Sequence, residues 1–259
     1  MQKKEWKDYE YIVAFNLYLR LPFGKIHKGN KEIIDLANLL DRTPSSIAMR
    51  LSNFAHLDPF HQNRGVLGLK GGKKQCQPIF DKYINDKENL MYESEQILAR
   101  LEGKTLEKKY EHELADIKHL KGLTKQRLVK TRINQNLFRK IILTNYNGRC
   151  AVSGIDLSSL LVASHIKPWA IDKNNRLNPE NGICLDVFYD KCFDKGLIGF
   201  DKNYSVVLSK HLQKLYHKNY FKKYFEPIDR KKIELPDRFL PNPEFLEFHI
   251  KNCFDKILS

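Results

Sequence analysis

The chain has 259 residues, enough for one large domain or for two smaller domains that each bury a core. Lysine and arginine number 45 against 31 aspartates and glutamates, so the formal net charge is +14, while 42% of the residues are hydrophobic. This composition argues against a disordered chain, and the charge predicts a polyanionic partner. No window approaches 18 consecutive apolar residues and no signal-type apolar core follows Met1, so we expect a cytoplasmic protein without membrane spans.

The cysteines are five in number and include no Cys-x-x-Cys pair. An odd number without such pairs argues against a disulfide framework and against a thiolate zinc site. We therefore expect reduced and mostly buried thiols.

Three stretches of the chain differ in character. Residues 1–85 are expected to form an N-terminal helical domain, 86–130 a helical connector, and 131–259 a C-terminal domain. Between residues 118 and 149 there are nine basic residues and no acidic one, which concentrates positive potential and favours phosphate contact. A solvated basic helix face is the alternative. The nine are Lys118, Lys121, Lys125, Arg127, Lys130, Arg132, Arg139, Lys140 and Arg149.

Residues 31–54 predict two short amphipathic helices around a tight turn, with Thr43 as cap and Pro44 at the first position of the second helix. This pattern resembles a helix-turn-helix, and a plain helical hairpin explains the same spacing. The basic, glycine-rich segment 64–74 that follows is expected to be a phosphate-facing loop or a simple turn. A DNA-binding second helix would present Ser45, Ser46, Met49, Arg50 and Asn53.

The most informative stretch begins with the apolar run 160–166, which predicts a buried strand with His165 at its end. A polar loop follows, and Asn181-Gly182 indicates a turn. Residues 183–188 then predict a second strand, and 189–195 one or two helical turns. The predicted order is strand, loop, strand, helix.

With its motifs Ser-His-Ile-Lys-Pro at 164–168, Asn-Gly at 181–182 and Phe-Asp-Lys-Gly-Leu-Ile at 193–198, this stretch resembles the HNH (ββα-metal) endonuclease family. Within the family it is similar to the branch of bacterial restriction endonucleases. The resemblance implies an α+β chain, in which a mainly helical, helix-turn-helix-like N-terminal domain precedes a C-terminal ββα-metal core at 150–201 with surrounding helices.

The resemblance also assigns chemistry to particular residues. It makes His165 the general base, Asn181 the residue that ties the loop to the strand, and Asp190 the metal ligand on the helix. Phosphodiester hydrolysis needs a base for water and a cation for the crowded phosphate. A carboxylate ligand favours Mg²⁺, or Mn²⁺, over Zn²⁺ as the divalent metal.

One residue near that ligand, Ser164, departs from the family pattern, and the role of a second, Asp194, stays open. Ser164, a weak neutral oxygen donor, stands where many members have an aspartate that binds the metal. Asp194 either completes the metal shell or caps the turn. Lys167 and Arg176 lie on the loop, where they could reach a phosphate; Arg132, Arg139 and Arg50 are the further DNA-contacting candidates.

The primary hypothesis is a metal-dependent DNA endonuclease of restriction or defence type. The alternatives are a non-catalytic DNA-binding regulator with a degenerate core, and a nuclease that acts on RNA or nicks its substrate. Since one core cuts one strand at a time, a double-strand break requires either a homodimer or two visits.

Residues 202–259 combine many lysines with closely spaced aromatic residues. Such rings can stack on nucleic-acid bases, although aromatic residues three or four apart on a helix are more often core. Both interpretations stay open at this stage. The rings in question are Tyr216, Tyr220, Phe221, Tyr224 and Phe225.

Overall fold

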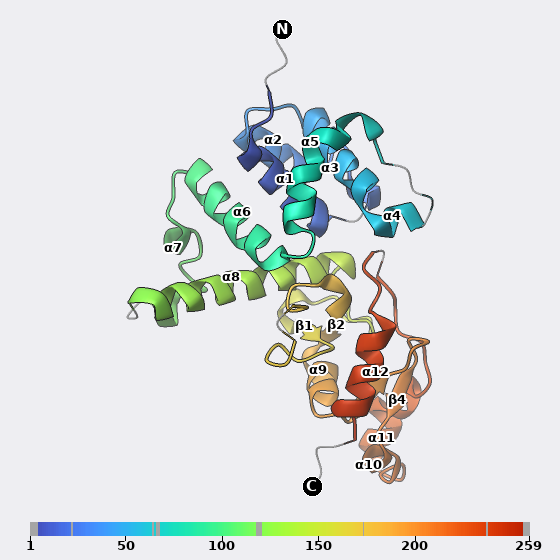
Figure 1. The fold of residues 1–259 in the computed structure, drawn as a ribbon. Helices are drawn as coiled ribbons and strands as arrows, with labels where there is room; N and C mark the ends of the chain where they lie inside the picture. The colour runs from blue at the N-terminus through green and yellow to red at the C-terminus, as the bar shows by residue number, and fades with distance from the viewer. Residues whose placement is uncertain are drawn as a thin grey trace. The chain divides into compact units, whose positions relative to one another are not determined.

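The computed structural model describes residues 5–21, 23–63, 65, 68–117, 121–172, 174–236 and 238–255. They divide into two compact units, an N-terminal unit of Met1–Leu137 and a C-terminal unit of Phe138–Ser259. Most of the described chain is helical and the strands form two small antiparallel sheets, so the fold is α+β, as the sequence predicts (Figure 1). Among the described helices, none has both the length and the apolarity needed to cross a membrane.

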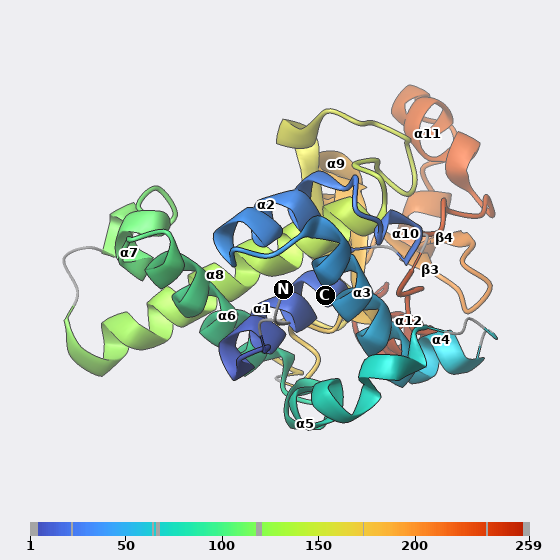
Figure 2. The ribbon, with the colours of Figure 1, turned by 90° about the horizontal axis from the view of Figure 1, so that it is seen from above.

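The N-terminal unit is built around helix α1, in which every residue from Glu10 to Leu19 is buried. Its core includes Phe15 and Phe54, whose rings stack with centroids 4.6 Å apart. Helix α3 packs against α1, α2 and α5 (Figure 2). The helices are α1 Asp8–Arg20, α2 Lys31–Leu39, α3 Pro44–Leu57, α4 Pro59–Asn63, α5 Lys73–Tyr83, α6 Lys87–Leu101 and α7 Leu106–Lys109, with 3-10 turns η1 Phe23–Lys25, η2 Lys70–Gly72 and η3 Ala115–Ile117.

Helices α2 and α3 form the predicted helix, turn and helix. The Thr43 hydroxyl accepts a hydrogen bond from the Ser46 amide, and proline stands in the first turn of α3, where its missing N–H has no cost. One residue expected to face DNA does not do so. Asn53 is buried, and its amide donates to the Leu69 carbonyl at 2.7 Å, because the segment after α4 folds back onto α3.

The expected connector at 86–130 contains α6, which belongs to the N-terminal core. Leu90 and Ile97 of α6 are buried in that core, and the helix packs directly against α1. The border between the units falls between Leu137 and Phe138, inside helix α8 (Gly122–Asn145). Parts of two predicted basic segments, residues 64, 66 and 67 and residues 118–120, lie outside the described residues.

The C-terminal unit contains the predicted strand, loop, strand and helix. Strands β1 and β2 pair antiparallel in a register that sets His165 opposite Gly182, and α9 packs on both strands (Figure 1). The elements are η4 Ser158–Leu160, β1 Leu161–His165, η5 Pro179–Asn181, β2 Gly182–Asp186, α9 Val187–Asp194, β3 Ile198–Phe200, β4 Val206–Leu208, α10 Lys210–Gln213, α11 Asn219–Tyr224, η6 Glu226–Ile228 and α12 Pro243–Asn252.

Strand β2 ends at Asp186, two residues before the predicted end of the second strand. The Asp186 carboxylate accepts hydrogen bonds from the amides of Phe188 and Tyr189, both at 3.0 Å, and so begins α9. A side-chain cap of this kind competes with continuation of the strand. As the composition predicts, most cysteines are buried free thiols: Cys76, Cys150, Cys184 and Cys192.

Candidate active site

His165 stands at the end of β1 with its ring packed between aromatic side chains. The imidazole stacks on the Phe138 ring of α8, with centroids 4.0 Å apart and planes 13° from parallel, and meets the edge of Trp169 at 5.3 Å. The residue opposite, Gly182, leaves room for this packing. A Cβ there would lie 2.4 Å from Ile142 Cδ1 and 2.7 Å from Phe138 Cζ. The glycine of the Asn-Gly turn is therefore needed for close approach of the sheet to α8.

A main-chain carbonyl fixes the protonation of this imidazole. His165 Nε2 lies 2.9 Å from the carbonyl oxygen of Arg176. A carbonyl can only accept, so Nε2 carries the proton and Nδ1 carries the lone pair. Burial lowers the pKa of His165, and the Arg176 charge also lowers it, while the hydrogen bond to the carbonyl acts in the opposite direction. The lowered pKa favours the neutral imidazole, in which Nδ1 can accept a proton.

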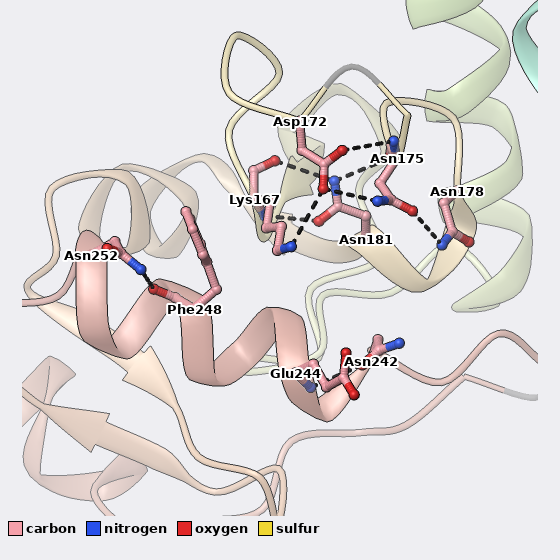
Figure 3. Close-up of polar contacts among 9 residues, drawn as sticks. All are labelled: Lys167, Asp172, Asn175, Asn178, Asn181, Asn242, Glu244, Phe248 and Asn252. Carbon is pink, nitrogen blue, oxygen red and sulfur yellow. Dashed lines mark hydrogen bonds and ion pairs between the residues drawn. The ribbon is translucent and has the colours of Figure 1, made fainter.

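Asn181 ties the loop between the strands to the end of β1. Its fully buried side chain accepts from the Lys167 amide at 2.8 Å and donates to the Lys167 carbonyl at 3.2 Å (Figure 3). The same amide group donates to the Asn175 carbonyl at 3.1 Å. Every contact is to the main chain, so this side chain organises the backbone around His165.

Further polar residues of this loop, to which no sequence motif assigned a role, continue the same network. The Asp172 carboxylate accepts from the Asn175 amide at 3.2 Å and from the Asn175 side chain at 2.8 Å, and Asn178 donates to the Asn175 side chain at 3.1 Å (Figure 3). Burial acts to raise the pKa of Asp172, but hydrogen bonds from Asn175 and Lys167 outweigh it and lower that pKa. The regular three-residue spacing of Asp172, Asn175, Asn178 and Asn181 is the sequence signal that could have found this network.

On the other side of the sheet, α9 brings carboxylates toward β1. Asp190 is half-buried, and burial raises its pKa; the neighbouring Ser164 hydroxyl opposes that rise, and the charge of Asp194 adds to it. Partial desolvation also raises the pKa of Asp194, one helical turn further along. The Ser164 hydroxyl is itself buried and lies beside the Asp190 carboxyl, which it stabilises in the charged form. The three predicted metal-binding residues therefore lie in one neighbourhood.

These oxygen donors fit a hard divalent cation. A buried hydroxyl beside a half-buried carboxylate offers lone pairs to a cation, and Mg²⁺ is usually held by one or two carboxylates with water and substrate phosphate. Within the described ranges, no group of three His, Cys, Asp or Glu residues is placed to hold a metal ion. The donor set thus suits Mg²⁺ or Mn²⁺ and lacks the ligands of a closed zinc site.

The structure does not bring all predicted site residues into contact. Successive side chains of a strand point to opposite faces, so Ser164 faces α9 while His165 faces α8. Among the residues described, no contact joins His165 to Asp190. His165 and the α9 carboxylates therefore flank the end of β1 from its two faces.

A family model described as HNH endonuclease matches residues 150–201, the segment that contains β1, β2, α9 and β3. The chain carries an HNH endonuclease domain. This domain supports nuclease activity, a phosphodiester hydrolysis that acts on nucleic acid, and HNH nucleases generally use a divalent metal. No curated protein matches the chain.

Within the HNH domain, two predicted phosphate-binding cations contact their own loop or a neighbouring helix. Lys167 Nζ lies 3.4 Å from the Asp172 carboxylate and sits over the Phe245 and Phe248 rings of α12, at 4.6 and 5.0 Å. Arg176 Nε donates to the Trp169 carbonyl at 2.8 Å, and its guanidinium lies over the indole ring. Both side chains remain partly exposed at the loop.

Three more predicted DNA contacts lie outside the HNH domain, and each makes contacts in its own unit. Arg139 donates to the carbonyls of Leu161 and Ser158 and so holds the entry to β1. In the N-terminal unit, Arg132 is paired with Asp116 at 2.5 Å. Arg50 packs over the rings of Trp6 and Tyr11.

Proposed function

We propose that this protein is a metal-dependent DNA endonuclease that hydrolyses phosphodiester bonds with His165 as general base. The observation that carries the proposal is the hydrogen bond between His165 Nε2 and the Arg176 carbonyl. It leaves Nδ1 as the basic nitrogen, and burial favours the neutral ring.

In the proposed reaction, His165 Nδ1 takes a proton from a water molecule while the water oxygen attacks phosphorus in line. The bond from phosphorus to the 3′ oxygen breaks, and the departing oxygen takes a proton from solvent water, which yields a 5′ phosphate and a 3′ hydroxyl. A positioned base of this kind contributes about 10² to 10⁴-fold in rate. Asn181 orients the base indirectly, through the main chain of the loop.

Asp190, Asp194 and Ser164 would hold the cation, with Mg²⁺ favoured and Mn²⁺ as an alternative. When bound, the cation would supply positive charge to offset the charge that develops on the phosphate. The support from this chain is the buried Ser164 hydroxyl beside the half-buried Asp190 carboxyl, with Asp194 one helical turn further along α9.

The choice of DNA as substrate rests on the net charge of +14 and on the helix, turn and helix of the N-terminal unit. Lys167 and Arg176 would contact phosphates next to the scissile bond; Arg132, Arg139 and Arg50 would act further away. The resemblance to restriction endonucleases supports a restriction or defence role in the cytoplasm. A double-strand break would then need a homodimer or two successive visits.

Cleavage of supercoiled plasmid DNA with Mg²⁺ tests the proposal directly. We expect His165→Ala to lose at least about 100-fold in rate, while His211→Ala, which changes an exposed histidine of the same unit, cleaves like the wild type. Equal cleavage by the wild type and His165→Ala would refute the assignment of His165 as general base. Accumulation of nicked circles, or preferential cleavage of structured RNA, would instead favour the nicking or RNA alternative.

A non-catalytic DNA-binding regulator is the second candidate, and the sparse set of metal-binding side chains favours it. Calorimetric titration with Mg²⁺ and with Mn²⁺ separates the two. A nuclease gives a binding heat that Asp190→Ala abolishes and that Asp156→Ala, at an exposed position of the same unit, retains. The absence of any heat, with DNA intact after long incubation, would support the regulator.

A further inference from the structure

Helices α9 and α11 expose aromatic rings that the proposed reaction does not use. Phe188 is 42% exposed, Tyr220 46% and Tyr224 42%. Exposed aromatic side chains that gather at one place usually indicate an interaction site. Phe188, Tyr220 and Tyr224 are called the aromatic surface below.

Ring contacts and buried neighbours hold the aromatic surface in place. The rings of Phe188 and Tyr224 have centroids 5.5 Å apart, and Tyr220 lies on the same face of α11, one turn earlier. The hydroxyl of Tyr189 on α9 donates to the Tyr224 carbonyl at 2.8 Å and so joins the two helices. Phe225 is buried beneath them and contacts the Phe188 ring. The rings are therefore presented by a packed framework.

The chain around the aromatic surface is strongly basic. Lys223 Nζ lies 5.1 Å from the centre of the Tyr224 ring, and Lys222 beside it is also exposed. Between residues 210 and 232, all of them described, Glu226 and Asp229 are the acidic residues. The basic ones, all exposed, are Lys210, Lys214, Lys218, Lys222, Lys223, Arg230, Lys231 and Lys232. Charge complementarity thus selects a polyanion as the occupant.

We propose that the aromatic surface binds a single-stranded segment of the nucleic-acid substrate, with bases stacked on the rings and phosphates held by the lysines. Inside a duplex the faces of the bases are already stacked, so only an unpaired strand can offer them to Tyr220 and Tyr224. Phe188 precedes Asp190 by two residues on α9, so a strand bound here lies next to the helix that carries the candidate metal ligand. The placement of the bound strand next to the reacting phosphate rests on the proposed function.

The stacking is tested with a fluorescent single-stranded oligodeoxythymidine and the full chain, by anisotropy in EDTA so that no cleavage occurs. We expect Tyr220→Ala/Tyr224→Ala to weaken binding at least about tenfold, since each of the two rings would lose a stacked base. Tyr220→Phe/Tyr224→Phe keeps the rings and therefore the affinity. Tyr216→Ala is the matched control, because that tyrosine is 68% exposed and its ring contacts His217.

The role of the lysines in holding phosphates is tested by charge reversal. Lys222→Glu/Lys223→Glu is expected to reduce the slope of log affinity against log salt by about 1.4, since each lysine that neutralises a phosphate of a single strand contributes about 0.7. Lys202→Glu/Lys251→Glu changes the net charge equally at exposed positions of the same unit and is expected to keep the slope. Far-ultraviolet circular dichroism verifies the fold of every variant.

The inference would be overturned by an affinity for the oligonucleotide that the double alanine variant leaves unchanged, or by equal losses for single strand and duplex. Loss of binding to anionic vesicles with oligonucleotide affinity retained would also overturn it, in favour of a membrane surface. Because these measurements need neither metal nor cleavage, they are independent of the His165 test. Strand binding by the aromatic surface can therefore be refuted without refuting the proposed reaction, and the reaction can be refuted without refuting strand binding.

Discussion

His165 and Arg176 are joined by a hydrogen bond in which the imidazole Nε2 lies 2.9 Å from a main-chain carbonyl oxygen. The carbonyl belongs to the polar loop between β1 and β2, a segment that Asn181 and Asp172 hold in shape. The tautomer and orientation of the proposed base thus depend on a loop with little regular secondary structure. A network of side-chain contacts to the main chain gives that loop a defined conformation.

The first prediction concerns the pH dependence of cleavage. Burial lowers the pKa of His165 below its ordinary value of 6.5, so the ring stays neutral, and able to accept a proton, at pH values where an exposed histidine is charged. Single-turnover cleavage measured from about pH 5 to 8 should lose rate on the acidic side with a midpoint below 6.5. A midpoint at or above 6.5, or the same acidic limb in His165→Ala, would contradict this assignment.

The second prediction concerns Asp172 as a positioning residue. Its carboxylate holds the amide and side chain of Asn175, the residue whose peptide bond leads into Arg176. Asp172→Ala removes both hydrogen bonds, each contributing about 0.5–1.5 kcal/mol. We expect kcat to fall about tenfold with KM almost unchanged, because the proposed base is displaced while the side chains proposed to contact DNA remain.

Asp172→Asn supplies the control for that prediction. The amide keeps an oxygen that can accept from the Asn175 main chain but removes the charge that faces Lys167, 3.4 Å away. It should recover most of the kcat that the alanine variant loses. If alanine and asparagine lose kcat equally, the loop acts through the ion pair with Lys167; if KM rises instead, Asp172 acts in binding.

Local rules in the sequence predicted the elements of the HNH domain and one helix pair of the N-terminal unit well. The apolar run before His165 and the turn at Asn181-Gly182 give the two strands, and the amphipathic pattern of 31–54 gives α2 and α3 with Thr43 as cap. Features of the fold that depend on contacts in space were not predictable from the sequence. Burial of α6 depends on the partner offered by α1, and the early end of β2 depends on the cap that Asp186 makes, which a strand pattern does not reveal.

The chemistry of the candidate site was less accessible to the sequence. The carbonyl that orients His165 belongs to the main chain, so no motif of side chains in the sequence indicates it. The pairing of Lys167 with Asp172, and the contacts of Arg139 to the carbonyls before β1, come from the path of the chain in space. Positive charge in a sequence predicts attraction to phosphate, but it does not show which cations are already engaged by their own fold.

The third prediction concerns acid stability and His249. This histidine of α12 is buried, stacks on Phe193 with ring centroids 3.8 Å apart, and burial lowers its pKa to about 4. Between about pH 6.5 and 4 the unfolded chain binds a proton that the folded chain does not, so the free energy of unfolding falls as pH falls through that window. The loss should reach about 3 kcal/mol at the acidic end.

Urea unfolding at several pH values measures this loss of stability at acidic pH. His249→Phe is the variant that keeps the stacked ring but cannot titrate. The variant should lose less stability than the wild type between pH 7 and 5. Part of the slope should remain, because burial also lowers the pKa of His165. Identical slopes for variant and wild type would show that folding does not lower the pKa of His249.

The fourth prediction joins the stability of the sheet to the proposed base through Gly182. A Cβ at this position would overlap Ile142 and Phe138, and the Phe138 ring is the one that stacks on His165. Gly182→Ala should therefore reduce the free energy of unfolding by about 1–3 kcal/mol, the usual range for overpacking, and should also slow cleavage by moving the ring beneath the base. Gly24→Ala is the control, since a Cβ there would meet no atom within 4 Å. Wild-type stability in the Gly182 variant would mean that α8 can move away from β2 at little cost, and the rate of that variant would then show whether His165 needs the Phe138 ring at all.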